Sequence, residues 1–381
     1  MITILWILFL SSCAYQLITV FLTRRFLRFD VLAASDPLPE YPLSHLKAVH
    51  GAHAETQAVL QTHCRQSYLG AVDLVFCAGD PEDPGLALAH RLAETHPQAR
   101  VVVKPFSERF PNPKITALQG AYPDCHQPFV LSTDCDMRAP SDFLNKMMAD
   151  FDDPKVGMVT SLYCIRRVPS ASVALEALSV LDFATSVLTA RATEGISFGL
   201  GAGMAFRREA LEGIGGFASV GDYLADDFQL GNKLHRAGWK VKLAGTILED
   251  VVPHTSFRGY IQHQLRWMRT LRVSRPIGHL SYIVTQGLPW VLGLLLLSGW
   301  TPTTWLASLA WMGIRIGCAR RCWSLLGGQS VNRWVQLVIL KDLIYLWLWL
   351  ASLVGDTVEW AGRRYYLYSD GRIRLSPPTI R

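Results

Sequence analysis

Apolar residues are concentrated towards the two ends of the chain. Residues 2–22 contain no charged side chain and are followed by Arg24, Arg25 and Arg28. About 20 apolar residues can cross the hydrocarbon core of a bilayer, and a basic flank favours the cytoplasmic side. A cleaved signal peptide is the alternative, but in a signal peptide the charges precede the apolar segment and an Ala-x-Ala site follows it. The pattern therefore predicts an N-terminal transmembrane helix whose far end faces the cytoplasm.

The C-terminal part of the chain holds three further apolar segments: residues 280–300, 305–318 and 334–354. Seven of the twelve tryptophans lie in these segments, as expected of rings placed at a membrane interface. The middle segment is short and carries Arg315, which is compatible with a hairpin or a re-entrant segment as well as with a span. In the last segment we expect Lys341 and Asp342 to pair inside the helix bundle. The pattern predicts two or three C-terminal membrane segments.

Between about residue 40 and residue 256, short β-branched stretches alternate with helical ones. The predicted strands are residues 72–77, 100–103, 129–131, 156–164 and 241–244, and the predicted helices are residues 84–95, 172–190, 209–214 and 226–237. This alternation predicts an α/β fold with a mostly parallel sheet covered by helices on both faces. Ligands of such sheets bind at the carboxyl ends of the strands. Asp80 and Asp134 each follow the end of a strand, which is the first indication of a single site.

Together these patterns divide the chain into five parts. They are an N-terminal transmembrane helix (1–28), an α/β domain (29–256), an amphipathic interfacial helix (257–278), a C-terminal transmembrane region (279–360) and a basic tail (361–381). The sequence thus predicts an integral, multi-pass membrane protein whose α/β domain faces the cytoplasm.

Composition and charge favour a membrane partner over nucleic acid. Half of the 381 residues are apolar, and the formal net charge is +6. The positive charge is modest and patchy, as expected from the positive-inside bias and from attraction to anionic lipid headgroups. The eight cysteines lack the paired spacing of a zinc site, and we expect them to be reduced core residues.

Asp134 and Asp136 are separated by one residue and come directly after a predicted buried strand. In an extended turn both carboxylates can face the same side and act as oxygen ligands for Mn²⁺ or Mg²⁺, which also contacts a diphosphate. An acidic turn with solvated side chains is the alternative, since Asp-x-Asp is a common pattern. A phosphatase that forms an aspartyl phosphate is disfavoured, because Arg138 stands where such an enzyme has Thr or Val.

Asp226 and Asp227 begin a predicted helix. A helix N-terminus favours carboxylates, so simple capping is the alternative role for Asp226. Asp227 would point elsewhere and could act as a general base. That role requires hydrogen-bond reach to a hydroxyl group and an environment that raises the pKa of the carboxyl.

Arginines recur at every third position of the following segment: Arg266, Arg269, Arg272 and Arg275. For the last three we expect a membrane-surface helix that contacts lipid headgroups. Arg266 together with Trp267 could instead offer a diphosphate contact and a stacking face.

Four other features carry candidate chemistry. Asp80 could accept hydrogen bonds from a uridine base, and Lys114 could direct a cation toward the nucleotide; a turn residue and a solvated lysine are the alternatives. His263 has no partner at metal-ligand spacing, so a structural role is expected. The glycines of 199–203 lack the order of a dinucleotide-binding fingerprint and indicate a close approach of the backbone to a sugar or a neighbouring element.

The candidate residues, taken in their order along the chain, resemble the conserved motifs of family 2-like glycosyltransferases of the GT-A fold. Within these they resemble the ceramide glucosyltransferase branch, family 21, which includes bacterial hopanoid-associated members. The matching segments are AGDPEDP at 78–84, NPKI at 112–115, DCDMR at 134–138, ADDF at 225–228, HQLRW at 263–267, GD at 355–356 and WAGRRY at 360–365. The ordered set is specific, although no single member is. The family signature is (Gln/Arg)-x-x-Arg-Trp. This chain departs from it at the first position, where it has His263, and its glutamine, Gln264, stands at the second position.

The resemblance implies a GT-A domain with one N-terminal and two to three C-terminal membrane helices. The implied site residues are Asp80, Lys114, Asp134, Arg266 and Trp267 for the nucleotide sugar, Asp134 and Asp136 for the metal, Asp227 as catalytic base, and His263 and Gln264 at the acceptor entrance.

The implied reaction is the inverting transfer of a hexose from a UDP-sugar to the hydroxyl of a membrane lipid, with Mn²⁺ or Mg²⁺ as cofactor. Glucose, N-acetylglucosamine and galactose all fit as the sugar, and ceramide and a hopanoid both fit as the acceptor. Two other functions are compatible with the sequence: sugar transfer to a polyprenyl phosphate, and a non-enzymatic membrane scaffold that binds a nucleotide. Processive polysaccharide synthases share the Arg-Trp signature but carry more membrane helices.

Overall fold

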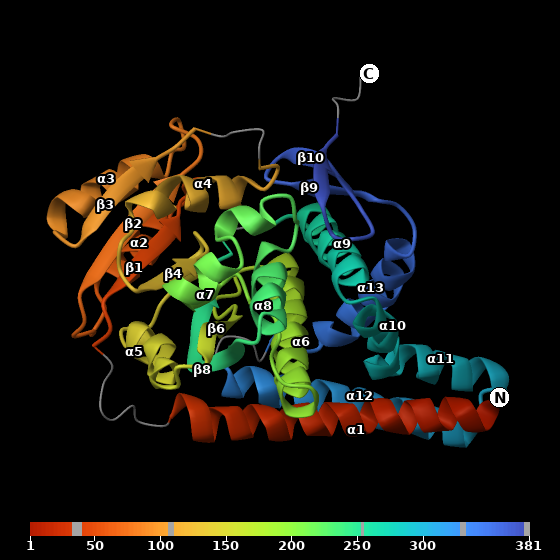
Figure 1. Cartoon of the computed structure of the whole chain (residues 1–381). Coiled ribbons are helices and arrows are strands. Elements are labelled where there is room, and N and C mark those ends of the chain that lie inside the picture. The colour runs from red at the N-terminus through yellow and green to blue at the C-terminus, as the bar shows by residue number, and fades with distance from the viewer. Residues whose placement is uncertain (33–39, 106–109, 253–254, 328–332, 377–381) are drawn as a thin grey trace. The chain divides into compact units, whose positions relative to one another are not determined.

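The computed structural model of the chain describes residues 1–32, 40–105, 110–252, 255–327 and 333–376. The chain forms two compact units, each assembled from segments that are distant in the sequence (Figure 1). The helical unit consists of Met1–Leu27, Cys164–Glu194 and His254–Glu359, and the sheet unit consists of Arg28–Tyr163, Gly195–Pro253 and Trp360–Arg381. The segment Cys164–Glu194, expected inside the α/β domain, therefore groups with helices from the two ends of the chain.

The sheet unit contains an eight-stranded sheet with the order β3-β2-β1-β4-β7-β6-β8-β5. Its strands are β1 (Leu43–Ala48), β2 (Val72–Ala78), β3 (Ala99–Val103), β4 (Phe129–Thr133), β5 (Met137–Arg138), β6 (Val156–Cys164), β7 (Gly203–Arg207) and β8 (Lys240–Asp250). β1 pairs in parallel with β2 and β4, and β2 pairs in parallel with β3. β7 runs antiparallel to β4 and β6, and β5 runs antiparallel to β8. The α/β class is confirmed, but the sheet is mixed, and the expectation of a mostly parallel sheet holds only for its first half.

Helices cover both faces of the parallel half of the sheet. The helices of this unit are α2 (Thr56–Cys64), α3 (Leu86–Thr95), α4 (Pro113–Ala121), α5 (Phe143–Met148), α7 (Arg208–Gly213) and α8 (Asp226–Arg236). Side chains of a strand alternate between the two faces of the sheet. On β2, Leu74 and Phe76 therefore pack with α2 and α3, whereas Val75 and Cys77 pack with α4. Burial on both faces explains why residues 74–78 of this strand are all apolar.

The C-terminal residues of the sheet unit form a hairpin. Its strands are β10 (Arg363–Leu367) and β11 (Ile373–Leu375), which follow β9 (Thr357–Trp360) in the sequence and pair antiparallel with each other. The N–H of Ile373 donates to the carbonyl of Asp222 at 2.6 Å, and the N–H of Leu224 donates to the carbonyl of Gly371 at 3.2 Å. The segment predicted to be a basic tail thus holds the residues that lead into α8.

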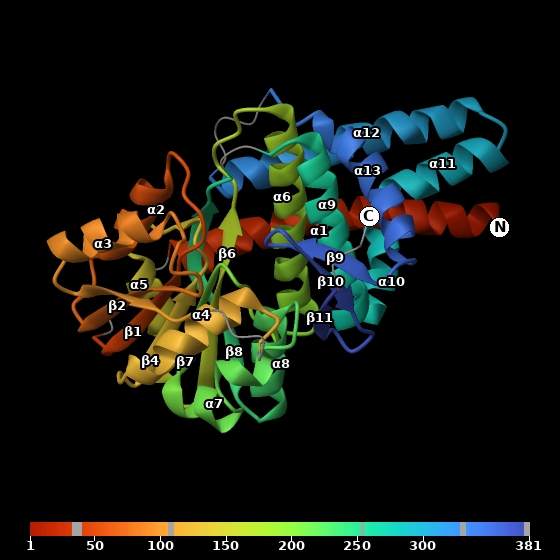
Figure 2. The same cartoon turned by 90° about the horizontal axis from the view of Figure 1, so that it is seen from above.

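The helical unit contains α1 (Ile2–Phe26), α6 (Ala171–Thr193), α9 (Phe257–Ser274), α10 (Pro276–Thr285), α11 (Gly287–Leu297), α12 (Pro302–Leu325) and α13 (Leu337–Ser352). α1 packs against α6, α11 and α12. α6 and α9 lie side by side, and α9 also packs against α13 (Figure 2). This packing brings residues of the α9 motif next to α6, which precedes it by more than 60 positions.

Two helices in the described part of the chain are long and apolar enough to cross a membrane: Ile2–Val31 and Ala171–Thr193. A third span results if α10 and α11, which are bent by 55° relative to each other, count as one. The expected segments 305–318 and 334–354 lie in α12 and α13, and neither of these helices meets the same criterion alone. Of the alternatives left open for the segment around Arg315, the hairpin is excluded, because α12 is one continuous helix of 24 residues.

All eight cysteines are free and seven of them are buried, as expected of reduced core residues.

Candidate functional site

The loop that follows β4 carries the first two candidate carboxylates. Asp134 and Asp136 lie between β4 and β5, and both side chains are half-buried. Lys47, fully buried on the adjacent strand β1, donates through Nζ to the main-chain carbonyl groups of Asp134 and Met137, the latter at 3.1 Å. Burial lowers the pKa of Lys47 to about 8, although the negative charges of the loop oppose the effect. The charged amino group of Lys47 therefore fixes this loop through two of its main-chain carbonyl groups.

Lys114 connects the β4 loop with the start of α8. Asn112 caps α4, because its side-chain oxygen accepts the N–H of Ile115 at 3.1 Å. From the first turn of this helix, Lys114 Nζ lies 2.5 Å from Asp134 Oδ1 and 3.6 Å from Asp226 Oδ2. Asn112 Nδ2 also donates to Asp226 Oδ1 at 3.1 Å. Burial disfavours the charged form of Lys114, but the attraction of the surrounding carboxylates outweighs it and raises the pKa of Lys114.

Asp227 is the second residue of α8, and its carboxylate is half-buried. Oδ2 accepts the N–H of Gly201 at 2.8 Å, and Oδ1 accepts the N–H of Phe228 at 2.7 Å. Burial and the charge of Asp226 raise the pKa of Asp227 to about 6, against the opposing effects of Lys114 and the two hydrogen bonds. A carboxyl with this pKa is ionised at neutral pH and is a better proton acceptor than an ordinary aspartate.

Gly201 lies where three of these side chains converge. A Cβ atom on Gly201 would be 3.0 Å from Asp134 Oδ2, 3.2 Å from Lys114 Nζ and 3.3 Å from Asp227 Oδ2. Only glycine allows the backbone to approach the charged groups this closely without displacing them. The structure thus places Asp134, Lys114 and Asp227 around a single point of the sheet unit.

The carboxylates of the site are suited to a divalent cation. Within the described residues, Asp136 Oδ1 and Asp226 Oδ2 are buried and have no hydrogen-bond partner. Burial and the charge of Asp134 raise the pKa of Asp136. The same part of the chain holds no group of three His, Cys, Asp or Glu side chains that could bind a metal by itself. Carboxylate oxygens in this number suit Mg²⁺ or Mn²⁺, which take their remaining ligands from phosphate oxygens and water.

Asp80 lies in an exposed turn after β2. Its Oδ1 atom accepts the N–H of Glu82 at 2.9 Å, so the carboxylate stabilises the turn. The turn is close to the start of α4, since a Cβ on Gly79 would lie 3.8 Å from the carbonyl oxygen of Pro113. Asp80 therefore stands near the helix that carries Lys114, with one carboxylate oxygen engaged locally.

The other predicted site residues belong to the helical unit, on α9: His263, Gln264, Arg266 and Trp267. Glu176 on α6 accepts hydrogen bonds from both His263 Nδ1 and Gln264 Nε2 at its Oε1 atom, each at 2.7 Å. The ring of Trp267 stands edge-on to the rings of His263 and Phe183, with centroid distances of 5.1 and 5.4 Å. One carboxylate from α6 therefore orients two consecutive residues of the motif.

The three following arginines, two on α9 and Arg275 directly after it, bind protein groups. Arg269 and Arg272 donate to main-chain carbonyl groups at and after the end of α13, those of Ser352, Val354, Gly355 and Thr357. Arg275 pairs with Glu194, the residue that ends α6. The guanidinium groups expected at lipid headgroups thus join α9 to two helix C-termini, where positive charge is favourable.

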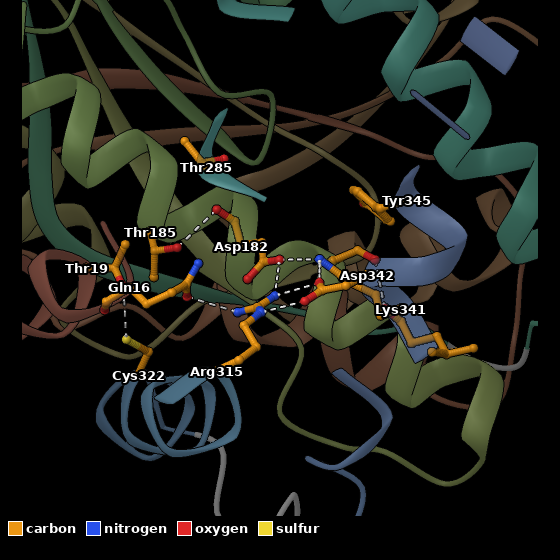
Figure 3. Close-up of polar contacts among 12 residues, drawn as sticks. Gln16, Thr19, Asp182, Thr185, Thr285, Arg315, Cys322, Lys341, Asp342 and Tyr345 are labelled. Atoms are coloured by element: carbon orange, nitrogen blue, oxygen red, sulfur yellow. Dashed lines mark hydrogen bonds and ion pairs between the residues drawn. The ribbon is translucent and has the colours of Figure 1, made fainter. Parts of the chain in front are cut away.

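Buried charges form a cluster inside the helical unit (Figure 3). Arg315 on α12 donates to both carboxylate oxygens of Asp342 on α13, at 2.8 and 2.9 Å, and to Asp182 on α6 at 2.6 Å. Lys341 pairs with Asp342 at 2.8 Å and also with Asp182. Gln16 of α1 accepts a further hydrogen bond from Arg315 at 3.2 Å. The expected pairing of Lys341 with Asp342 inside the bundle is confirmed, and the cluster joins four helices.

Sequence reasoning did not single out Lys47, Glu176 or Asp182. Glu176 and Asp182 are charged residues within a largely apolar helix, and Lys47 is a charged residue within a buried strand; such residues are rarely buried without a partner. That signal could have identified them, although it does not reveal their partners.

Comparisons with known proteins show the family and the fold of the chain. A family model described as Glycosyl transferase family 21 matches residues 4–373. Ceramide glucosyltransferase 1 of Caenorhabditis elegans is 22% identical over 358 residues, covering 90% of this chain and 75% of that protein. Ceramide glucosyltransferase 3 of the same organism is 22% identical over 316 residues, covering 79% and 67%. The structure of the mannosyltransferase PcManGT from Pyrobaculum calidifontis, in complex with GDP-Man and Mn²⁺, is similar with a TM-score of 0.56 at 20% identity, covering 90% of this chain and 98% of that one, which shows a shared fold.

Proposed function

Because the chain belongs to glycosyl transferase family 21, we propose that it transfers a hexose from a UDP-sugar to the hydroxyl of a membrane lipid, with inversion at the sugar. The names of the two nematode relatives support a ceramide-like acceptor, and the helices long enough to cross a membrane support a lipid. The protein is proposed to be multi-pass, with its sheet unit in the cytoplasm. Arg24 and Arg25 at the end of α1 and Arg28 just beyond it support this orientation.

The observation that carries the proposal is the convergence of Asp134, Lys114 and Asp227 at Gly201. Transfer from a nucleoside diphosphate needs a proton acceptor for the attacking hydroxyl and positive charge for the departing diphosphate. Asp227 supplies the first requirement, and Lys114 contributes to the second. Both lie within reach of one reacting centre, which a purely structural acidic turn would not require.

Asp227 is proposed to act as the general base. In the reaction, the lipid oxygen forms a bond to the anomeric carbon while the bond from that carbon to the diphosphate oxygen breaks. The hydroxyl proton passes to Asp227, and UDP leaves with the bonding electron pair. The hydrogen bond from Gly201 fixes the orientation of the Asp227 carboxylate before the substrates bind.

Asp134 and Asp136 are proposed to hold Mn²⁺ or Mg²⁺ together with the diphosphate. When bound, the cation would neutralise charge on the departing diphosphate. Lys47 keeps the main chain of this loop in place through the carbonyl groups of Asp134 and Met137. The presence of Mn²⁺ in the PcManGT complex is consistent with a divalent ion in this fold.

The remaining residues are proposed to bind the two substrates. Asp80 would accept hydrogen bonds from the uridine base through the carboxylate oxygen that does not bind the N–H of Glu82. Arg266 and Trp267 would contact the diphosphate and the sugar. His263 and Gln264 would lie at the acceptor entrance. No role in nucleic acid binding is proposed.

The proposal is tested by product analysis and one substitution. Purified protein in lipid nanodiscs is incubated with labelled UDP-glucose, UDP-N-acetylglucosamine or UDP-galactose and with ceramide, a hopanoid alcohol or a polyprenyl phosphate, and the products are identified by mass spectrometry. We expect a glycosylated lipid alcohol, loss of product on chelation and recovery with Mn²⁺ or Mg²⁺. Asp227→Asn should lower kcat by about 10²- to 10⁴-fold with UDP binding retained.

The control variant is Asp222→Asn, an exposed carboxylate earlier in the same segment. Near-normal turnover by Asp227→Asn would refute the base assignment. Preferred transfer to the polyprenyl phosphate with only a mild effect of Asp227→Asn would identify a phosphate acceptor, which needs no base. Metal-independent nucleotide binding without UDP release in the presence of lipid would identify a scaffold.

A further inference from the structure

The C-terminal hairpin begins within the matched segment 360–365, which has no part in the proposed reaction. Its strands β10 and β11 carry three almost fully buried side chains, those of Tyr365, Leu367 and Ile373. Between the two strands, Gly371 has a φ of 87°, which glycine adopts without strain. The hairpin is therefore a packed part of the sheet unit and not a solvated tail.

The hairpin extends its pairing to the segment that leads into α8. Residues 371–373 run antiparallel to residues 222–224, with main-chain hydrogen bonds of 2.6 and 3.2 Å on either side of the bridge between Tyr223 and Arg372. The guanidinium group of Arg372 also lies over the ring of Tyr223, 5.7 Å from its centroid. Both hydrogen bonds use main-chain atoms, so a change in the side chain of Asp222 leaves them in place.

Asn112 binds the same segment from the start of α4. Its N–H donates to the carbonyl of Gly221 at 3.1 Å, and its Nδ2 atom donates to the carbonyl of Tyr223 at 3.0 Å and to Asp226 Oδ1 at 3.1 Å. The chain just before Asp227 is thus held by a helix that carries site residues and by the last strand of the hairpin.

The start of α8 depends on such contacts. Within the described residues, no side chain caps this helix, whose N-cap residue is Ala225. The first N–H groups of a helix have no partners inside the helix, so an end without a side-chain cap is held less firmly than a capped one. Asp227 lies in this first turn, and Gly201 can orient its carboxylate only while the turn is in place.

We propose that the C-terminal hairpin is a positioning element of the transfer reaction, in which residues 371–373 fix the start of α8 and thereby the place of the Asp227 carboxylate beside Gly201. This inference rests on the proposed role of Asp227 as the base. Because the hairpin acts through Asp227, loss of its pairing should lower kcat and leave the affinity for UDP unchanged.

Ile373→Pro removes the N–H that donates to Asp222. In an antiparallel pair, alternate residues of a strand turn their N–H groups away from the partner strand. The bonds from Tyr368 to the carbonyl of Arg372 and from Ser376 to that of Arg364 show that the N–H of Ile373 is such a group. Proline at this position therefore spares the hydrogen bonds between β10 and β11.

Two controls separate the N–H from other effects of the substitution. Ile373→Ala loses most of the same buried side chain but keeps the N–H, so it reports the cost of the side chain alone. Leu375→Pro places a proline on the same side of β11, two residues beyond the contact with Asp222. Only Ile373→Pro should free the segment before α8.

The first measurement is hydrogen–deuterium exchange of the full-length protein in lipid nanodiscs, followed in peptides that cover residues 221–228. We expect exchange there to be roughly five- to tenfold faster in Ile373→Pro than in Ile373→Ala, the effect of one hydrogen bond. The second is steady-state kinetics with the lipid acceptor that the unaltered protein uses. Ile373→Pro should have a kcat about tenfold below that of Ile373→Ala, since small displacements of a reacting group are costly. The two variants should bind UDP equally well in calorimetry.

The outcomes separate this inference from the proposed function. Equal exchange at 221–228 in the two Ile373 variants, or equally fast exchange in Leu375→Pro, would show that the contact with Asp222 does not hold the segment. Faster exchange in Ile373→Pro with the kcat of Ile373→Ala would overturn the positioning role while the transfer reaction stands. A joint loss of kcat and UDP affinity would overturn it as well, because the hairpin would then support the whole site. If the unaltered protein transfers no sugar, the proposed function fails and the inference fails with it.

Discussion

Lys114 is placed among the carboxylates of the sheet unit, and replacing it by methionine tests whether Asp227 titrates as the base. Asp227 accepts a proton only when it is ionised, so activity should fall as the pH falls through its pKa of about 6. The positive charge of Lys114 favours the ionised form and lowers that pKa. Removing the charge favours the neutral acid, so the acid limb of the pH profile should move to higher pH.

The size of this effect follows from the geometry at Gly201. A Cβ on Gly201 would lie 3.2 Å from Lys114 Nζ and 3.3 Å from Asp227 Oδ2, so these two atoms are at most 6.5 Å apart, the sum of the two distances. Two unit charges at about 6.5 Å attract by about 0.6 kcal/mol in water and by about 2.6 kcal/mol at an effective dielectric constant near 20. Since about 1.4 kcal/mol corresponds to one pH unit, the acid limb should move up by about 0.5 to 2 pH units.

The assay is the pH dependence of kcat/KM, which reports groups of the free enzyme. Lys114→Met should lower the plateau as well, but the midpoint of the acid limb does not depend on the height of the plateau. Lys114→Arg keeps the charge and should keep the midpoint. Lys240→Met removes a half-exposed surface lysine that pairs with Asp153, and it should change neither value. An acid limb that stays in place or moves to lower pH in Lys114→Met would refute the reasoning.

Two further substitutions probe packing rather than titration. Gly201→Ala inserts a methyl group among Asp134, Lys114 and Asp227. Displacements of these side chains by a few tenths of an ångström should lower kcat by about tenfold, since a 1 Å misplacement costs about 10²-fold. Gly213→Ala, whose new methyl group meets nothing within 4 Å, is the control, and equal kcat values for the two variants would contradict the prediction. Arg315→Met leaves the carboxylates of Asp182 and Asp342 with a single cation and should lower the free energy of unfolding by about 3–5 kcal/mol. The measurement is thermal unfolding in detergent. A melting temperature as high as that of Lys240→Met would show that the cluster does not stabilise the bundle.

The strands of the parallel half were predictable where both of their faces are buried. β2 contains the apolar stretch 74–78 and β4 the apolar stretch 129–131, and each is followed by turn residues, so their position and the site at their carboxyl ends follow from the sequence. β1 escaped prediction because it carries His45 and Lys47, which are fully buried and bind the last residue of β4 and the loop that follows it. Polar residues in a strand usually indicate a solvated face, and only the tertiary partners reveal that these are inside.

The antiparallel half and the grouping of α6 depend on contacts that no local pattern contains. β7 begins at Gly203, directly after the glycine-rich segment, and its direction is set by pairing with β4 and β6. The apolar stretch of α6 predicts a buried helix equally well in either unit. In the helical unit it packs against α1, α9, α12 and α13, and Glu176 and Asp182 add polar contacts to His263 and Lys341, which lie 87 and 159 positions further along the chain.

The two clusters of buried charge differ in a way that separates a structural role from a functional one. In the helical unit, two cations and two carboxylates balance, and within the described residues none of their buried side-chain polar atoms lacks a hydrogen-bond partner. In the sheet unit, four carboxylates (Asp134, Asp136, Asp226 and Asp227) face two ammonium groups (Lys47 and Lys114). Within the described residues, Asp136 Oδ1 and Asp226 Oδ2 are buried and accept no hydrogen bond, although Lys114 Nζ lies 3.6 Å from Asp226 Oδ2. The formal charge of this second cluster is −2, which a single divalent cation would neutralise. A balanced cluster needs no ligand, whereas this excess of negative charge favours the binding of a divalent cation and is consistent with the proposed metal site in the sheet unit.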